Sequence, residues 1–346
     1  MSILSGVSDF FGLDLGSTAI RVVQLHGAGS PKTLAKYGQI ATSGNMTLSD
    51  AKEDRARVSA AVRELVRRSG ISTKNVVANL PSNRVFTTVI DMDRMAPPEM
   101  ANTITYQADS FIPTPVAQSK IDWAVIGNSP KDPKKVEVLM SSVPNDFIEA
   151  RLDMLEAAGL NVLAFEPDSL ALMRAVIPPD MISPQLVLDV GSISTDLVIA
   201  MNGAPHLTRA IPIGSSSFVR AAVQNLSIEL AQAQQFVFKF GVARDKLEGK
   251  IYGAIIGTVD SLMAEVEKSI KFFQSRYPNT KLDRIIVTGG ASSLPEFPLY
   301  IANRFGINVE IGNSWRNVSF PAGQQNELLA VSNHFAVAVG LAERNQ

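Results

Sequence analysis

The sequence predicts an α/β protein with two lobes, because one strand–turn–strand unit occurs twice in its 346 residues. The first unit centres on the turn Asp14-Leu15-Gly16-Ser17-Thr18, and the second on Asp189-Val190-Gly191-Ser192. Each turn follows an apolar run and leads into another, which is typical of paired buried strands. The Pro-rich stretch 177–184 lies between the two units and predicts a linker between the lobes.

Composition excludes several classes of function. The chain has no Cys, which excludes disulfides, thiol catalysis and Cys-based metal sites, and its three His are widely spaced. The net charge of −1 gives no reason to expect nucleic acid as a partner. No apolar stretch approaches the roughly 20 residues of a membrane-spanning helix, and the N-terminus lacks the pattern of a secretion signal. We therefore expect a cytoplasmic protein without direct membrane insertion.

The two Asp-Gly turns have the chemistry of a phosphate site. Glycine lets a backbone approach a ligand closely, and consecutive turn N–H groups can form a nest for an anion. A carboxylate beside bound phosphates can hold hydrated magnesium, which prefers oxygen ligands. Either turn alone is equally an ordinary hairpin turn. Two such turns facing each other would form a nucleotide clamp.

A third Gly-rich segment follows near the C-terminus. Residues 285–295 read as an apolar strand that runs into the turn Gly289-Gly290-Ala291 and then into a helix. Paired glycines let a backbone lie flat against a planar base or a sugar. A plain strand-to-helix turn is the alternative interpretation.

The remaining pattern predicts further elements around these units. An amphipathic helix is expected over 49–69, capped by Ser49 or Asp50 and ended by Gly70. Charges of both signs on this helix indicate a solvated face. The other expected elements are strands at 75–80 and 84–91, a helix from 97 to about 112, strands at 121–126 and 136–143, a helix over 146–158, and mostly helix over 216–276.

The order of the three turns resembles that of the actin-like ATPase superfamily, in which the first two bind phosphate and the third binds adenosine. Residues 165–172 and 334–342 look like its two connecting helices. The resemblance implies two lobes, each with a ribonuclease-H-like mixed sheet, and ATP with Mg²⁺ as ligands. The implied subdomains are 1–91 with 160–182, an inserted α/β subdomain at 92–159, 183–220 with 277–346, and a helical subdomain at 221–276.

The position of the insert narrows the resemblance to the PilM family of type IV pilus assembly proteins, close to the cell-division actin homologue. The similar stretches are 11–25, 76–82, 104–115, 121–127, 152–160 and 265–273, so the resemblance covers nearly the whole chain. Two positions depart from the family pattern. Arg21 stands where Lys is usual, and Ala291 where a third glycine is common.

Chemistry and resemblance together assign the candidate site. Asp14 and Asp189 would hold the magnesium. The residues expected to contact the nucleotide are Gly16, Ser17, Thr18 and Arg21 at one turn, Gly191, Ser192, Ser194 and Thr195 at the other, and Gly289, Gly290, Ala291 and Ser292 at the third.

Three further residues enter by analogy with the chaperone ATPases of the superfamily. Glu265 and Lys268 lie three positions apart on one helix face, as do the residues that meet ribose and adenine there. A surface ion pair is the alternative. Glu166 is the candidate catalytic residue for positioning a hydrolytic water, although it could equally be structural.

The resemblance implies a cytoplasmic ATP-binding scaffold of type IV pilus assembly, with slow ATP hydrolysis at most. Such a protein docks the N-terminal cytoplasmic segment of a PilN-type inner-membrane protein and links it to the assembly machinery, including its assembly ATPases. The resemblance is also compatible with a homo-oligomer. The expected groove is walled by the strand after Val76, by residues 80–84 and by the helix from Met100 to Phe111. Attachment to the inner membrane would come through the partner, because the chain stops at Gln346 without a membrane-targeting tail.

Two other functions compete with the scaffold. One is a filament-forming cytoskeletal or cell-division protein of the same superfamily. The other is a small-molecule kinase, which needs a sugar site and a catalytic Asp, and the sequence offers no residue for these roles.

Overall fold

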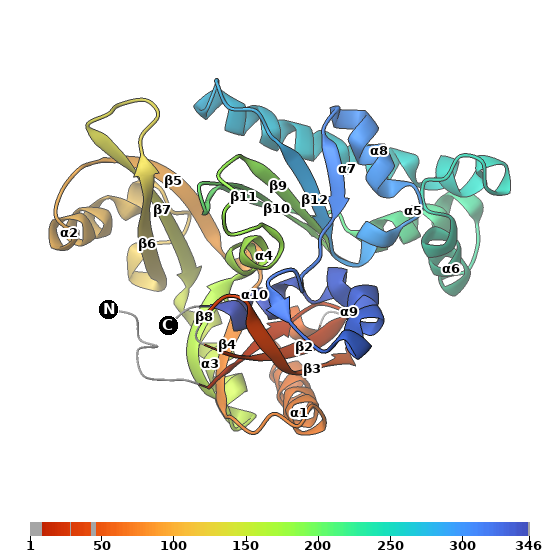
Figure 1. The fold of residues 1–346 in the computed structure, drawn as a ribbon, viewed down its shortest axis with the longest axis horizontal. Helices are drawn as coiled ribbons and strands as arrows, with labels where there is room; N and C mark the ends of the chain where they lie inside the picture. The colour runs from red at the N-terminus through yellow and green to blue at the C-terminus, as the bar shows by residue number, and fades with distance from the viewer. Residues whose placement is uncertain (1–8, 28, 43–45, 345–346) are drawn as a thin grey trace.

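Two mixed sheets with the same strand order form the two lobes (Figure 1). The protein is described by a computed structural model over residues 9–27, 29–42 and 46–344. The expectations of no secretion signal and no membrane-targeting tail concern residues 1–8 and Gln346, which lie outside the described residues. In each lobe three antiparallel strands are followed by two strands parallel to the first. The predicted duplication of the strand–turn–strand unit is therefore confirmed.

The strands of the first lobe are β1 (Phe11–Leu15), β2 (Ala19–His26), β3 (Lys32–Ala41), β4 (Asn75–Leu80) and β8 (Asn161–Pro167), with the short β14 (Val318–Ser319) beside β3. Those of the second lobe are β9 (Gln185–Val190), β10 (Thr195–Met201), β11 (Ala204–Ile211), β12 (Arg284–Thr288) and β13 (Asn308–Ile311). Because β1 and β9 are central and buried, the turns that follow them emerge at the middle of each sheet.

Helices cover both faces of the sheets. The two connecting helices, α4 (Asp168–Val176) and α10 (Ala336–Glu343), lie between the lobes and share one apolar core with both sheets (Figure 1). The outer face of the first sheet is covered by α1 (Lys52–Arg68) and α3 (Asn145–Ala157). The second lobe carries α5 (Ser215–Leu226), α6 (Leu230–Phe240), α7 (Lys250–Arg276) and α8 (Phe297–Phe305), and α9 (Gln325–Val331) precedes α10.

The inserted subdomain is a separate three-stranded sheet of β5 (Phe86–Asp93), β6 (Ser119–Asn128) and β7 (Lys135–Pro144), covered by α2 (Pro97–Gln107). Its extent differs from the expected 92–159. The sheet already includes β5, because Phe86 pairs with Ser142 of β7. At the other end α3 buries Met154 and Leu155 in the core of the first lobe rather than in the insert.

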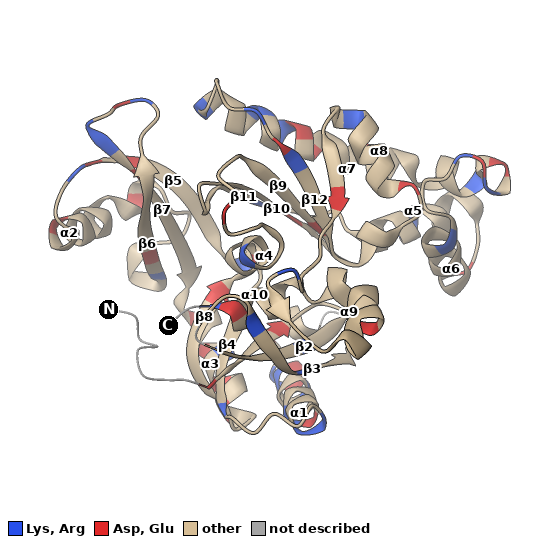
Figure 2. Cartoon of the chain, in the orientation of Figure 1, with Lys and Arg blue, Asp and Glu red and all other residues tan. Residues whose placement is uncertain are grey.

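The ends of α1 show where local signals were misleading. The helix begins at Lys52 after Ala51, and neither Ser49 nor Asp50 caps it with a side chain; Ser49 accepts a bond from the Ala51 amide instead. Gly70 follows its C-terminal end with a φ of +67°, as predicted. Figure 2 shows charges of both signs interspersed along α1. No helix in the described ranges is long and apolar enough to cross a membrane.

Candidate functional site

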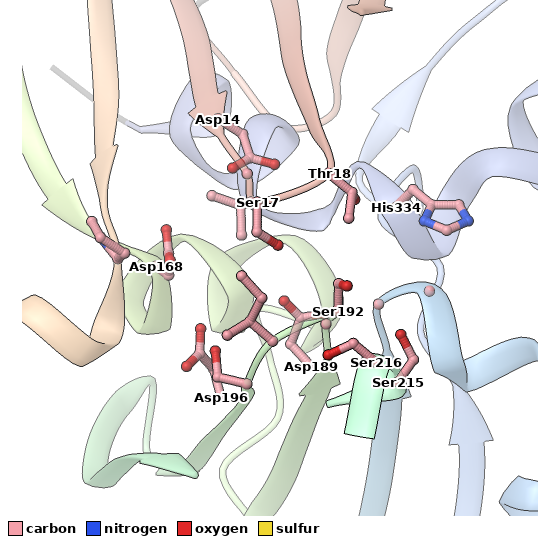
Figure 3. A pocket seen from close by; sticks show the side chains of 18 of the residues that line it. Asp14, Ser17, Thr18, Asp168, Asp189, Ser192, Asp196, Ser215, Ser216 and His334 are labelled. Atoms are coloured by element: carbon pink, nitrogen blue, oxygen red, sulfur yellow. The ribbon is translucent and has the colours of Figure 1, made fainter. Parts of the chain in front are cut away.

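A cavity of about 800 Å³ lies between the two lobes and is lined by all three Gly-rich turns. Ser17 and Thr18 of the first turn lie opposite Asp189 and Ser192 of the second (Figure 3). This is the facing arrangement expected for a clamp. It follows from the repeated sheet order, because each turn emerges beside the same central strand of its lobe.

The first turn is held from outside by hydroxyl and amide donors. The Thr47 hydroxyl donates to the Gly16 carbonyl at 3.0 Å, and the Thr42 amide donates to the Thr18 carbonyl at 2.9 Å. A Cβ at position 16 would lie 2.7 Å from the Ala19 carbonyl oxygen, so the tight turn requires glycine. These hydrogen bonds to the turn's carbonyls fix the shape of the turn in the ligand-free protein.

The second turn is joined to the start of α5. The Gly191 amide donates to the Ser194 carbonyl at 3.0 Å, which closes the turn. The Gly191 and Ser192 carbonyls accept bonds from the Ser215 and Ser216 amides, each at 2.9 Å. The N-terminus of α5, where the helix dipole is positive, therefore lies at the cavity beside the turn, and this favours an anionic ligand.

The third turn packs against the second. Gly289 has a φ of +80°, and a Cβ there would meet the Asp189 carboxylate at 2.5 Å. Its amide donates to the Asn333 carbonyl at 2.8 Å, and the Asn333 side chain donates back to the Gly289 carbonyl at 3.1 Å. This exchange ties the turn to the segment before α10, whose His334 also lines the cavity. Burial, with the nearby charge of Arg21, lowers the pKa of His334.

Four aspartates from both lobes line the cavity: Asp14, Asp168, Asp189 and Asp196. Burial raises the pKa of each, and in Asp168, Asp189 and Asp196 the charges of neighbouring aspartates raise it further. The pKa of Asp189 reaches about 8. The cluster is thus an electrostatically unfavourable group of carboxylates that a bound cation would stabilise.

Two polar side chains organise the first-lobe side of this cluster. The Asn79 amide nitrogen donates to Asp168 at 2.8 Å and to Asp14 at 3.4 Å, while its oxygen accepts the Leu15 amide at 2.8 Å. Arg21 approaches Asp14 at 3.5 Å. This contact is long, and among the residues that the structure describes no cationic side chain forms an ion pair with Asp189. The carboxylates are therefore incompletely neutralised, which favours binding of a cation.

The donor set fits magnesium. Within the described ranges no group of three or more His, Cys, Asp or Glu side chains is arranged to hold a metal ion directly. Magnesium retains several waters and takes one or two carboxylates together with substrate phosphates. Asp14 and Asp189, on opposite sides of the cavity, match that requirement better than a cage built from protein ligands alone (Figure 3).

The structure brings most of the predicted residues together. Those that line the cavity are Asp14, Gly16, Ser17, Thr18, Arg21, Asp189, Gly191, Ser192, Ser194, Gly289 and Gly290. Thr195, Ala291 and Ser292 are fully buried and do not line it. The Thr195 hydroxyl donates to the Ile213 carbonyl at 2.7 Å and that of Ser292 to the Gly289 carbonyl at 2.8 Å, so both hold backbone rather than face a ligand.

The residues proposed by analogy with the chaperones lie elsewhere. Glu166 is buried outside the cavity, where its carboxylate lies 2.7 Å from Arg174 and 3.1 Å from Arg344. The structural alternative therefore describes it better than the catalytic one. Glu265 and Lys268 form a 2.6 Å ion pair on α7 and are not among the residues that line the cavity, as the alternative of a surface ion pair describes.

Several cavity residues were missed by sequence reasoning. Asp196 follows Thr195, and because side chains alternate along a strand it takes the cavity side of β10. From the helical subdomain the cavity is lined by Leu230, Gln234 and Phe238. Their i, i+4, i+8 spacing on α6 was visible in the sequence, but it normally indicates core, whereas Leu230 is 61% and Phe238 39% exposed.

Comparison with solved structures identifies the fold. The chain superimposes on a PilM–PilN type IV pilus biogenesis complex with a TM-score of 0.83 and 24% identity, covering 97% of this chain and 98% of the other. The ethanolamine utilization protein EutJ of Carboxydothermus hydrogenoformans matches with a TM-score of 0.56 and 16% identity over 96% of this chain and 88% of that one. MreB5 of Spiroplasma citri bound to AMPPNP matches with a TM-score of 0.56 and 12% identity, covering 96% of this chain and 95% of that one.

These likenesses confirm the predicted actin-like fold. The family described as type IV pilus assembly protein PilM matches residues 12–346, which include all three turns, the insert and both connecting helices. The chain therefore belongs to the PilM family of type IV pilus assembly proteins.

Proposed function

We propose that the protein is an ATP-binding scaffold of type IV pilus assembly that captures the N-terminal cytoplasmic segment of a PilN-type inner-membrane protein. The observation that supports ATP binding is the pair of Asp-Gly turns that face each other across the cavity (Figure 3). Family membership favours assembly over the filament and kinase alternatives. Through this partner the protein would lie at the inner membrane and connect to other assembly components, including the assembly ATPases.

The phosphates of ATP would bind between the turns. Backbone N–H groups and hydroxyls of Ser17, Thr18 and Ser192 offer donors, and the N-terminus of α5 adds a favourable dipole. Asp14 and Asp189 would hold the hydrated Mg²⁺. When bound, the ion neutralises phosphate charge and the buried carboxylates at the same time.

The base and sugar would extend toward the second lobe. There Gly289 and Gly290 leave room on one side, and Leu230 and Phe238 offer apolar surface on the other. An aromatic or aliphatic platform suits a planar base. We therefore propose that α6, instead of Glu265 and Lys268, contacts the base and the sugar.

The partner segment is proposed to bind beside the insert. The expected wall after Val76 is not available, because β4 is almost entirely buried, and Arg84 already pairs with Asp50 at 3.0 Å. The end of α2 and the turn after it remain, where Tyr106 is 93% and Phe111 40% exposed. Aromatic anchors of this kind contribute much of the affinity for a short segment.

We expect Phe111→Ala to weaken binding of a fluorescent peptide that copies the N-terminal segment of the PilN-type partner by about tenfold, since truncating an aromatic anchor costs on the order of 1–2 kcal/mol. Fluorescence anisotropy with the full chain measures this. Phe272→Ala is the matched control, because Phe272 is 64% exposed on α7 of the second lobe. Cross-links from the peptide to residues beyond Pro184 would contradict this placement.

A further inference from the structure

The inserted subdomain and the second lobe do not share an apolar core. Among the described residues, the apolar core of the insert and that of the second lobe are separate clusters, and no cluster joins them. The insert is covalently attached to the first lobe on both sides, through residues 84–86 and 144–145. Parts of a protein that share no apolar core can move relative to each other unless specific contacts prevent it.

Specific contacts are concentrated at one buried point. Arg276, at the end of α7, donates to Glu137 of β7 at 2.9 Å and to Asp91 of β5 at 2.8 Å. The Tyr277 hydroxyl donates to the same Glu137 oxygen at 2.6 Å. Glu137 is only 2% exposed, and the His206 ring of β11 packs edge-on against Tyr277 at 5.4 Å. We call Arg276, Tyr277, Glu137 and Asp91 the clasp.

The clasp lies at one end of two neighbouring sheet edges. β5 is the edge of the insert sheet and β11 the edge of the second-lobe sheet, and they lie side by side (Figure 1). At the end away from the clasp a cavity of about 420 Å³ separates Phe86 and Thr87 from Thr208 and Ala210. Among the described residues, the side-chain hydrogen bonds and ion pairs between the insert and the second lobe thus lie at the clasp end, whereas at the cavity end β11 contacts only the short segment Ser82–Arg84 before β5 and the start of β5 itself.

The second-lobe edge is linked to the site between the lobes. Ala210 of β11 pairs with Asp196 of β10, which lines the large cavity. The Thr195 hydroxyl also bonds the Ile213 carbonyl just after β11. A change at the second phosphate turn therefore reaches β11 through direct hydrogen bonds.

We propose that the clasp makes the insert move with the second lobe, so that nucleotide bound between the lobes sets the position of the insert against the first lobe. This inference rests on the proposed ATP binding. Buried ion pairs are weak evidence for stability. The role assigned to the clasp here is to fix one arrangement of the insert against the second lobe. The consequence is that the partner surface on the insert responds to nucleotide.

Spin-label distances test the proposal, and the absence of native Cys makes labelling simple. One label pair, Lys134→Cys with Asn308→Cys, measures the distance from the insert to the second lobe. The other pair, Lys134→Cys with Ala60→Cys, measures the distance from the insert to the first lobe. All three positions are exposed. In the wild-type background we expect the first distance to stay fixed and the second to shift when Mg-ATP is added.

Glu137→Gln is the variant of choice, because it removes the charge and keeps an oxygen for Tyr277. We expect it to broaden the insert-to-second-lobe distance and to abolish the ATP-dependent shift, while ATP affinity stays unchanged. Asp91→Asn is a milder second variant, expected to show a smaller loss in the same direction. Arg304→Gln, which breaks an ion pair with Glu267 within the second lobe, is the control.

The outcomes separate the two claims. If ATP binds and the Glu137→Gln distances match the wild type, with and without ATP, the clasp proposal is overturned. Folding of each variant is verified by its unfolding transition, and Asp91→Asn decides the matter if Glu137→Gln does not fold. Failure of ATP to bind the wild-type protein contradicts the proposed function itself, and is recognised by direct titration before any distance is measured.

Discussion

Asp189→Asn is expected to raise the free energy of unfolding of the nucleotide-free protein by about 1–2 kcal/mol at pH 8, a gain typical of relieving strain at a functional site. The side chain is partly buried, and this desolvation together with the charges of Asp196 and Asp14 opposes its ionisation. An amide of the same shape carries no charge and removes this repulsion. The protein would thus become more stable while losing a proposed magnesium ligand.

The sign of the pH dependence follows from the direction of the shift. The pKa of Asp189 rises from its ordinary 3.8 to about 8 in the folded protein, so the folded state holds this proton more tightly. Its stabilising contribution is complete below the unfolded pKa and is lost as the pH rises through the folded pKa. The advantage of Asp189→Asn should therefore be larger at pH 8 than at pH 5.5.

Urea unfolding in EDTA at these two pH values measures the effect. Asp180→Asn is the matched control, because Asp180 is exposed in the linker between the lobes and should respond at neither pH. A variant at position 189 that is less stable than the wild type, or whose advantage does not grow with pH, would show that the carboxylates do not repel one another as described.

Gly340→Ala is expected to destabilise the protein by about 3 kcal/mol or more, since overpacking at a backbone contact exceeds the usual cost of an extra methyl. Gly340 lies in α10, where a Cβ would come within 1.9 Å of the Ala171 carbonyl oxygen of α4. That obstacle is backbone, so no side-chain rotation relieves it. The two connecting helices would have to separate, and with them the segment of Asn333 and His334 that lines the cavity.

The same substitution at a second glycine, which serves as the control, is expected to change stability in the opposite direction. At Gly257, in the interior of α7, a new Cβ would meet nothing within 4 Å. Gly257→Ala should therefore stabilise the protein by about 0.5–1 kcal/mol through helix propensity. Thermal and urea unfolding compare the two variants. Equal effects of both substitutions would mean that α4 and α10 are not in the close contact described.

Local chemistry made the turns predictable. Apolar runs of strand length flank each Asp-Gly turn, and the tight geometry at Gly16 and Gly289 requires a residue without a Cβ. Such signals lie within a few residues of one another, so a single sequence contains them. The two lobes followed from the duplication, and the mixed sheet in each lobe from the resemblance.

Features that depend on tertiary packing were not predictable in this way. Whether Thr195 or Asp196 faces the cavity depends on the phase of one strand, which the turn motif does not fix. The ion pair of Glu265 with Lys268 has the same spacing whether or not a ligand lies beside it. The clasp joins Glu137 to Arg276 across 139 positions of sequence, and no local pattern marks that contact.

The central claim is that Mg-ATP binds between the two Asp-Gly turns, and calorimetric titration of Mg-ATP into the full chain tests it most directly. Asp14→Ala and Asp189→Ala should each weaken binding by about tenfold or more, equivalent to at least 1.4 kcal/mol, and should remove its dependence on Mg²⁺. Lys268→Ala, outside the cavity, should bind as the wild type does. If both aspartate variants bind Mg-ATP as tightly as the wild-type protein, the nucleotide does not bind in this clamp.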